Sequence, residues 1–228
     1  MISIIIPVYN ESKNIVKLIK EIELCLANKD YEIIIIDDSS IDDTVNVIKN
    51  LKKIKVKILK NKYNKGQSFC INRGIINSKY NTIITIDGDG QNNPKDIIRL
   101  LNMYNSNEEI YLVGGIRKKR RDSYVKVFSS IVANYVRSKF LRDNCKDTGC
   151  ALKVFDKKIY LQFPYFNGIH RFLPALFKGY GYNTIFLKVD HRQREFGYSN
   201  YGIGNRLFRG IRDMIKVRNI IKRNQNHG

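Results

Sequence analysis

Short runs of aliphatic, Ile- and Val-rich sequence recur along the first half of the chain, separated by segments with a helical spacing of apolar residues. The runs are Ile2–Val8, Tyr31–Asp37, Val56–Leu59 and Thr82–Asp87. A strand that is apolar on both faces has to be covered on both sides, so these runs predict a parallel sheet with helices on each face. The alternation of strands and helices predicts βαβ units and an α/β fold.

Polar clusters follow three of these runs at the point where each run ends. They are Tyr9–Glu11, Asp37–Ser40 and Asp87–Gln91. In open α/β sheets, ligands bind beyond the carboxyl ends of the strands. We therefore expect the three clusters to line one site, although acidic residues after a strand can also cap the next helix. Capping is the interpretation that we favour for Asp42 and Asp43.

The pair Asp87 and Asp89 needs another explanation, because Asn93 and Pro94 provide a better start for the next helix. Mg²⁺ and Mn²⁺ bind hard oxygen ligands, and Mg²⁺ uses one or two carboxylates while substrate phosphates fill other positions. Two carboxylates at a strand end, with Gly88 between them, therefore suit a metal–diphosphate site.

Two common nucleotide-binding signatures are missing from the sequence. The chain has no G-x-x-x-x-G-K-[ST] motif, and no G-x-G-x-x-G follows the first predicted strand. This argues against kinases, P-loop enzymes and dinucleotide enzymes. A nucleotide would instead be held by Glu11 and Asp38, which can accept hydrogen bonds from a base or a ribose.

The chain is strongly basic, with 41 Lys and Arg against 21 Asp and Glu and a net charge of +20. Such a balance predicts attraction to polyanions, which include nucleic acid, anionic membranes and phosphorylated substrates. A nucleic-acid-binding protein would explain the charge but not Asp38, Asp87 and Asp89, which repel phosphate unless a metal intervenes. We therefore expect no nucleic-acid partner.

The four cysteines form no C-x-x-C pair, which predicts buried thiols in a reducing cytosol rather than disulfides or zinc. The N-terminus has no basic n-region of a signal peptide, and no stretch approaches the ~20 apolar residues that span a bilayer. We expect a protein that is soluble or peripheral at a membrane.

The second half of the chain carries much of the positive charge. A strand is predicted at Ile110–Gly114 and a helix through Tyr124–Leu141, with a basic run over 117–121 that an exposed loop would explain. In segment 203–228, apolar and basic residues alternate at helical spacing. This amphipathic helix either lies in a membrane interface or packs on the domain with a solvated outer face.

Several motifs carry a family resemblance when taken together and in order. "SIIIPVYNE", "IIIIDDSSIDDT", "NKGQS…NRGI" and "IDGDGQNNP" resemble the N-terminal half of family-2 inverting glycosyltransferases. "DTGCALKVFDK", "HRFLPALFKGYGY" and "HRQREFGYSNYG" are similar to the branch with dolichyl-phosphate mannose synthases and bacterial polyprenyl-phosphate glycosyltransferases. The resemblance covers nearly the whole chain, from Ile2 to about Arg218.

The resemblance implies a GT-A fold with a mostly parallel central sheet. One domain would cover 1–202, with a nucleotide-sugar half at about 1–93 and an acceptor half at about 94–202, followed by the basic segment 203–228. It also implies Mg²⁺ or Mn²⁺, a UDP- or GDP-linked sugar as donor, and a dolichyl or undecaprenyl phosphate as acceptor. The enzyme would work at the cytoplasmic face of an anionic membrane, docked peripherally or through a small membrane subunit.

The resemblance assigns roles to individual residues on the donor side. Pro7, Tyr9, Glu11 and Asp38 would line the nucleotide pocket, and Asp87 would lie near the ribose and diphosphate. The metal ligands would be Asp89 and Gln91.

The acceptor side is assigned in the same way. The acceptor phosphate would meet Arg117, Ser130, Asn134, Arg194 and Ser199. Asn200 stands where the family pattern has Lys, so Arg192, Arg194 or Arg206 would have to supply the missing cation.

A phosphate acceptor removes the need for a strong base. A phosphate monoester, with a second pKa of about 6, is already largely ionised near neutral pH, so placing and stabilising the phosphates is the main task. Asp89, through the metal, would stabilise the leaving diphosphate, and Arg117 and Arg194 would hold the acceptor phosphate. Asp147 is either a base or orienting carboxylate, or a turn-stabilising aspartate. His170 and His191 are expected to be core or supporting residues.

Two alternatives to this function remain at the level of sequence. The first is a transferase of the same fold that acts on a glycan hydroxyl or a protein. The second is an inactive homologue: the intact acidic cluster argues against it, whereas Asn200 in place of the family lysine is compatible with it.

Overall fold

The computed structural model describes residues 1–51, 56–118, 135–196 and 204–226, with side chains of the last helix described from Gly210 onward. A short helical segment occupies residues 135–141. The other elements are β1 Ile2–Val8, α1 Ile15–Cys25, β2 Tyr31–Asp37, α2 Thr44–Lys49, β3 Val56–Lys60, α3 Gln67–Ile76, β4 Thr82–Thr85, α4 Lys95–Asn105, β5 Ile110–Arg117, β6 Lys153–Asp156, α6 Lys157–Tyr160, η1 Ile169–Arg171, α7 Leu173–Gly179, β7 Asn183–Val189 and α8 Gly204–Asn226.

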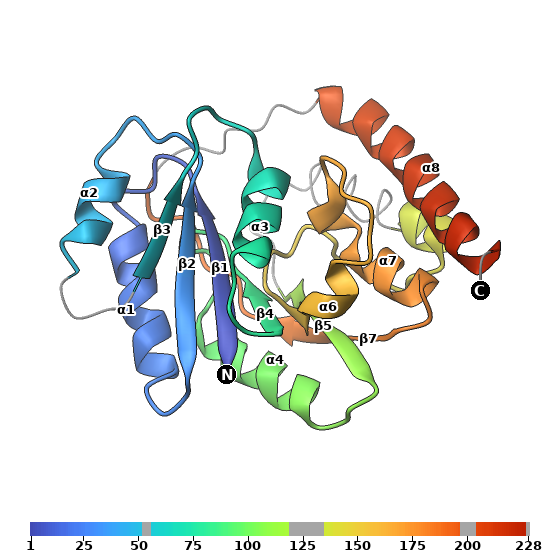
Figure 1. Ribbon diagram of the computed structural model, residues 1–228, viewed down its shortest axis with the longest axis horizontal. Coiled ribbons are helices and arrows are strands. Elements are labelled where there is room, and N and C mark those ends of the chain that lie inside the picture. The colour runs from blue at the N-terminus through green and yellow to red at the C-terminus, as the bar shows by residue number, and fades with distance from the viewer. Residues whose placement is uncertain (52–55, 119–134, 197–203, 227–228) are drawn as a thin grey trace.

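The strands form one seven-stranded sheet in the order β3-β2-β1-β4-β6-β5-β7 (Figure 1). β6 runs antiparallel to β4 and β5, and the other pairings are parallel. This confirms the predicted α/β fold with a mostly parallel sheet. β4 ends at Thr85, earlier than predicted, and β5 continues to Arg117, beyond the predicted end at Gly114.

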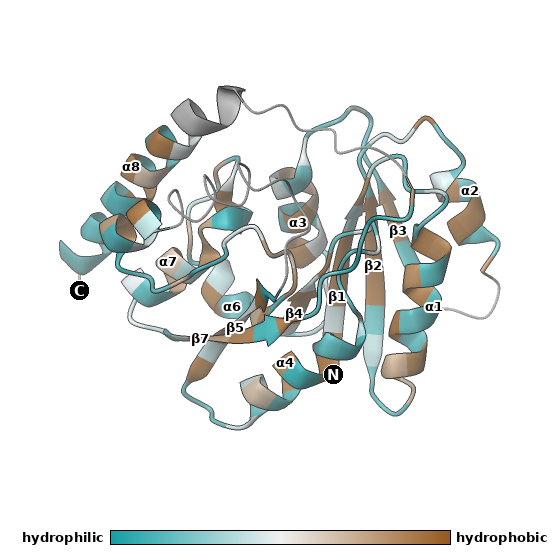
Figure 2. Cartoon of the chain, turned by 180° about the vertical axis from the view of Figure 1, so that it is seen from behind, coloured by the Kyte–Doolittle hydropathy of each residue, from teal (hydrophilic) through white to brown (hydrophobic). Residues whose placement is uncertain are grey.

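Helices cover both faces of the sheet, as the apolar runs predicted. Along β1, Ile4 and Ile6 pack with α1, α2 and α4 on one face, whereas Ile5 packs with α3, α7 and α8 on the other. All three side chains are fully buried. Figure 2 shows hydrophobic residues gathered on the strands between these layers. A sheet covered on both sides leaves its strand ends as the place where polar side chains can meet solvent.

The C-terminal helix α8 packs against α7 through one face. Asp213 accepts a hydrogen bond of 2.9 Å from Arg171, and Val217 is fully buried. A Cβ on Gly179 would lie 2.5 Å from Ile221, so the two helices approach closely at this glycine. Over 210–226 one face of the helix therefore packs on the domain, and the other face is exposed.

The cysteines agree with the expectation of unpaired thiols. All four cysteines are free, and Cys70, Cys145 and Cys150 are buried. Among the described residues, no helix has both the length and the apolar character needed to cross a membrane.

His170 is a partly buried histidine whose lowered pKa leads to a stability prediction. Its Nδ1 lies 2.5 Å from Ser68 Oγ, and burial, with the charges of Lys153 and Arg171, lowers its pKa to about 3. An unfolded histidine binds a proton below pH 6.5, whereas the folded one does not until about pH 3. Stability from this group is therefore complete above about pH 6.5 and falls as the pH falls.

Between pH 7 and pH 5, we expect the titration of His170 to lower the unfolding free energy of the wild type by about 2 kcal/mol. The His170→Gln variant should lack this part of the pH-dependent loss. Urea titrations of both proteins at the two pH values measure the difference. Equal losses would show that His170 is not held neutral.

Candidate active site at the carboxyl edge of the sheet

The turns after β1 and β2 are joined by hydrogen bonds. Asn10 and Ser39 adopt positive φ angles of 57° and 68°. The Asn10 side-chain oxygen accepts a 2.9 Å hydrogen bond from the Ile41 amide, and the Asn10 amide donates to Ser40 Oγ at 2.9 Å. Left-handed conformations at non-glycine residues are costly and cluster at functional sites. The first two predicted polar clusters therefore meet at one edge of the sheet.

The acidic loop after β4 presses against the end of β1. A Cβ on Gly88 would lie 2.7 Å from Val8 Cγ1 and 3.1 Å from the Pro7 carbonyl oxygen, so a side chain at this position would collide. The close approach places Asp87 and Asp89 beside the β1–α1 turn. The third predicted cluster thus joins the other two, and the prediction of a shared edge is confirmed.

Asp87 lies at the centre of a group of like charges. Burial and the neighbouring Asp89 raise the pKa of Asp87 to about 7, and Glu11 adds to the effect. Lys153 and Arg117 act in the opposite direction. One oxygen of Asp87 accepts a 2.6 Å hydrogen bond from Gln67 Nε2. A further cation beside Asp87 and Asp89 would therefore favour the ionised form of Asp87.

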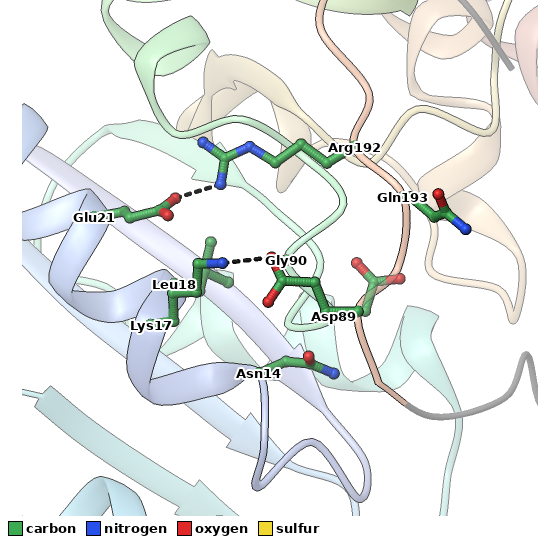
Figure 3. Close-up of a pocket in the computed structure, with 9 residues that line it drawn as sticks. Asn14, Lys17, Leu18, Glu21, Asp89, Gly90, Arg192 and Gln193 are labelled. Atoms are coloured by element: carbon green, nitrogen blue, oxygen red, sulfur yellow. Dashed lines mark hydrogen bonds and ion pairs between the residues drawn. The ribbon is translucent and has the colours of Figure 1, made fainter. Parts of the chain in front are cut away.

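Asp89 faces a pocket between α1 and the segment after β7 (Figure 3). Its Oδ1 accepts a 3.1 Å hydrogen bond from the Gln91 amide, which turns the loop back on itself. The pocket is lined by Asn14, Lys17, Leu18, Glu21, Asp89, Gly90, Arg192, Gln193 and Glu195.

The carboxylate of Asp38 accepts hydrogen bonds from the loop between β3 and α3. Its oxygens accept hydrogen bonds from Asn61 Nδ2 at 2.7 Å, the Lys65 amide at 2.9 Å and the Gly66 amide at 2.7 Å. Because Gln67 follows directly and donates to Asp87, the first residues of α3 connect the two aspartates. Asp38 therefore shapes one wall of the site through its backbone partners.

Glu11 is buried at the start of α1 and bonded on both oxygens. Asn14 Nδ2 donates to one oxygen at 2.7 Å, and the Arg194 guanidinium pairs with the other. Burial raises the pKa of Glu11 despite these partners. Tyr9, two residues earlier, is half-buried at the end of β1.

Arg117 and Asp147 form a bidentate ion pair. Arg117 Nε and one terminal nitrogen each donate to a different oxygen of Asp147 at 2.7 Å, and the Arg117 amide donates to the same carboxylate at 3.2 Å. Burial lowers the pKa of Arg117, but the hydrogen bonds and charge of Asp147 outweigh it and leave the pKa raised. Side-chain exposures are 13% and 7%, so the pair is largely desolvated.

The segment 191–196 crosses the site as a strap tied to α1. Arg192 pairs with Glu21 at 2.6 Å and donates to Asn93 at 2.9 Å, while Glu195 pairs with Lys17. The Arg192 amide also donates to the Gln91 carbonyl at 2.8 Å. Figure 3 marks the ion pairs that connect α1 to the strap. The strap thereby brings Arg192 to the acidic loop and Arg194 to Glu11.

Sequence reasoning missed Gln67 and Lys153. Lys153 is 4% exposed and donates to the Cys150 carbonyl, and its register places it between Thr85 of β4 and Gly114 of β5. A lone lysine in the apolar run "ALKVF" was the available signal, since a buried ammonium needs a nearby carboxylate or carbonyl.

Some predicted residues cannot be placed. Ser130, Asn134, Ser199 and Asn200 lie outside the described residues, as does the side chain of Arg206. His191 forms an isolated bridge with Asn92 beside the acidic loop.

Solved structures of similar fold include those of a distantly related enzyme. Glucosyl-3-phosphoglycerate synthase from Mycobacterium tuberculosis in complex with UDP superposes with a TM-score of 0.72 at 16% identity, covering 99% of this chain and 80% of that one. Its complex with Mn²⁺, UDP-glucose and glycerol 3-phosphate gives a TM-score of 0.69 at 15% identity over 95% and 78%. These similarities confirm the GT-A fold.

Curated relatives are more similar in sequence. The chain is 32% identical to dodecaprenyl-phosphate galacturonate synthase of Rhizobium johnstonii over 95% of its length and 66% of the relative. It is 31% identical to undecaprenyl-phosphate 4-deoxy-4-formamido-L-arabinose transferase of Edwardsiella ictaluri over 89% and 63%. The chain thus spans just under two thirds of the length of these relatives. The model of glycosyl transferase family 2 matches residues 3–165, and the chain belongs to this family of enzymes.

Proposed function

We propose that the chain transfers a sugar from a UDP- or GDP-linked donor to a polyprenyl phosphate, such as dolichyl or undecaprenyl phosphate, with the help of Mg²⁺ or Mn²⁺. The observation that carries the proposal is the excess of carboxylate at the sheet edge beside a desolvated arginine. A lipid phosphate as acceptor is supported by two relatives of the chain, since the name of each includes a polyprenyl phosphate.

The donor nucleotide is proposed to lie along the ends of β1, β2 and β4. Pro7, Tyr9 and Glu11 follow β1, and Asp38 holds the β3–α3 loop through the Lys65 and Gly66 amides. Asp87 faces the ribose and diphosphate. Asp38 contributes here chiefly by fixing the loop that borders the nucleotide.

The residues present fit a divalent cation. Asp89 and the side-chain oxygen of Gln91 offer hard oxygen ligands, and a cation would favour the ionised form of Asp87, whose pKa is raised by burial and by Asp89. Among the described residues, no group of three or more His, Cys, Asp or Glu side chains could hold a metal by itself. Diphosphate oxygens would complete the coordination, and the ion would stabilise the leaving diphosphate.

The acceptor phosphate is proposed to meet Arg117. Asp147 fixes the guanidinium with two hydrogen bonds, so the arginine is preorganised and little side-chain freedom is lost on binding. A positioned arginine stabilises an ionised phosphate without any proton transfer. Arg194 of the strap and, outside the described residues, Ser130, Asn134 and Ser199 complete the acceptor side.

This arrangement favours a phosphate over a hydroxyl acceptor. A hydroxyl needs a general base, and the candidate, Asp147, has both oxygens bonded to Arg117. Asp147 is therefore an orienting carboxylate in this proposal. Asn200 departs from the family lysine, and Arg192, which lies beside the acidic loop, is the proposed substitute.

The place of action is proposed to be the cytoplasmic face of an anionic membrane. The chain would dock there peripherally or through a small membrane subunit. The net charge of +20 supports attraction to anionic lipid.

The proposal is tested by transfer of radiolabel from a panel of UDP- and GDP-sugars to undecaprenyl phosphate, with Mg²⁺, Mn²⁺ or chelator. We expect a lipid-linked product that needs the metal and falls at least about 100-fold in Asp89→Ala, because the leaving diphosphate loses its cation. Metal-independent transfer, or full activity of the variant, would contradict the metal role. Donor hydrolysis without lipid product would move the acceptor to another class.

The ion pair of Arg117 and Asp147 is tested by Asp147→Asn. We expect the KM for the acceptor to rise about 10- to 100-fold, because the guanidinium loses its fixed position, while the KM for the donor stays constant. The matched control is Asp190→Asn, which breaks the exposed ion pair to the adjacent Lys118 and is expected to change little. A fall in kcat with an unchanged acceptor KM would instead identify Asp147 as a base.

A further inference from the structure

Five apolar side chains are exposed on the described part of α8, from Gly210 onward, and on the neighbouring helical segment 135–141. Ile211 and Ile215 of α8 are 45% and 51% exposed. They are four residues apart, so they share one face of the helix. The opposite face carries Asp213 and Val217, which are buried against the domain. The two isoleucines are therefore not part of the core.

The helical segment 135–141 extends this apolar surface. Tyr135, Val136 and Phe140 are 63%, 52% and 37% exposed. The Arg218 guanidinium lies 4.6 Å from the centre of the Phe140 ring, which places this segment beside α8. We call the surface formed by Tyr135, Val136, Phe140, Ile211 and Ile215 the apolar ridge.

Cations border the apolar ridge on both elements. Lys139 is exposed next to Phe140, and Arg212, Lys216 and Lys222 are exposed along α8. The acidic residue of α8, Asp213, is buried and paired with Arg171. Figure 2 shows hydrophobic residues set among hydrophilic ones along this helix. Over the described residues of the two helices, the exposed charge is therefore positive.

We propose that the apolar ridge is the surface by which the protein inserts into the interface of an anionic phospholipid bilayer. Apolar side chains at the centre with Lys and Arg at the border are what such an interface requires: the former enter the acyl boundary and the latter contact lipid phosphates. This inference deepens the proposed function, because it assigns membrane docking to a defined surface that includes a second element besides α8.

The test is flotation of the full chain with vesicles of phosphatidylcholine alone or mixed with phosphatidylglycerol. We expect binding to the anionic vesicles, weakened at least about tenfold in Ile211→Ser/Ile215→Ser by loss of apolar insertion. Arg212→Gln/Lys222→Gln should weaken it about fivefold for each charge. The matched control is Leu24→Ser/Ile41→Ser, which removes apolar residues that are 79% and 88% exposed elsewhere and should bind as the wild type does.

Two results would overturn the inference. One is equal binding of the wild type and the isoleucine variant to anionic vesicles. The other is a dimer, detected by light scattering, that the isoleucine variant abolishes, since a second copy would then cover the ridge. Sugar transfer to a short-chain, water-soluble prenyl phosphate does not need membrane docking. The isoleucine variant should therefore retain this activity even if it no longer binds vesicles, which distinguishes a failure of docking from a failure of the proposed function.

Discussion

Mutual repulsion among Glu11, Asp87 and Asp89 at one edge of the sheet is the constraint on which the rest of the site depends. The ends of the neighbouring parallel strands β1 and β4 bring these carboxylates together, and burial raises the pKa of Asp87 to about 7. The chain opposes this cost with Lys153 and Arg117 on the far side of β4 and with Arg194 on Glu11. A cation bound beside Asp87 and Asp89, as proposed, would offset this cost.

The antiparallel strand β6 positions the residues of the proposed acceptor side. By entering between β4 and β5, it places Lys153 beside Thr85 and Gly114, and the loop before it brings Asp147 to Arg117 at the end of β5. The strap after β7 then crosses the site from the other side and returns Arg194 to Glu11. The carboxylates proposed to bind the donor and the arginines proposed to bind the acceptor are thus held by different parts of one continuous sheet.

The donor side could be predicted from sequence because each of its residues ends a local pattern. Ile2–Val8 and Tyr31–Asp37 are strands with the predicted bounds, since fully buried parallel strands read as unbroken apolar runs. β6 was missed because it is four residues long and antiparallel, so no periodicity distinguishes it. The pairing of Arg117 with Asp147 and the use of Asp38 by the β3–α3 loop are long-range contacts, which local spacing cannot contain.

The central claim is that the acidic edge holds a metal–diphosphate complex, and the most direct measurement is calorimetric titration of UDP and GDP in the presence and absence of Mn²⁺. If the account is right, metal and nucleotide strengthen each other's binding by the same factor, as linkage requires, and Asp89→Asn removes that coupling while the fold stays intact. Nucleotide binding of equal strength with Mn²⁺ and with chelator, in wild type and variant alike, would contradict it.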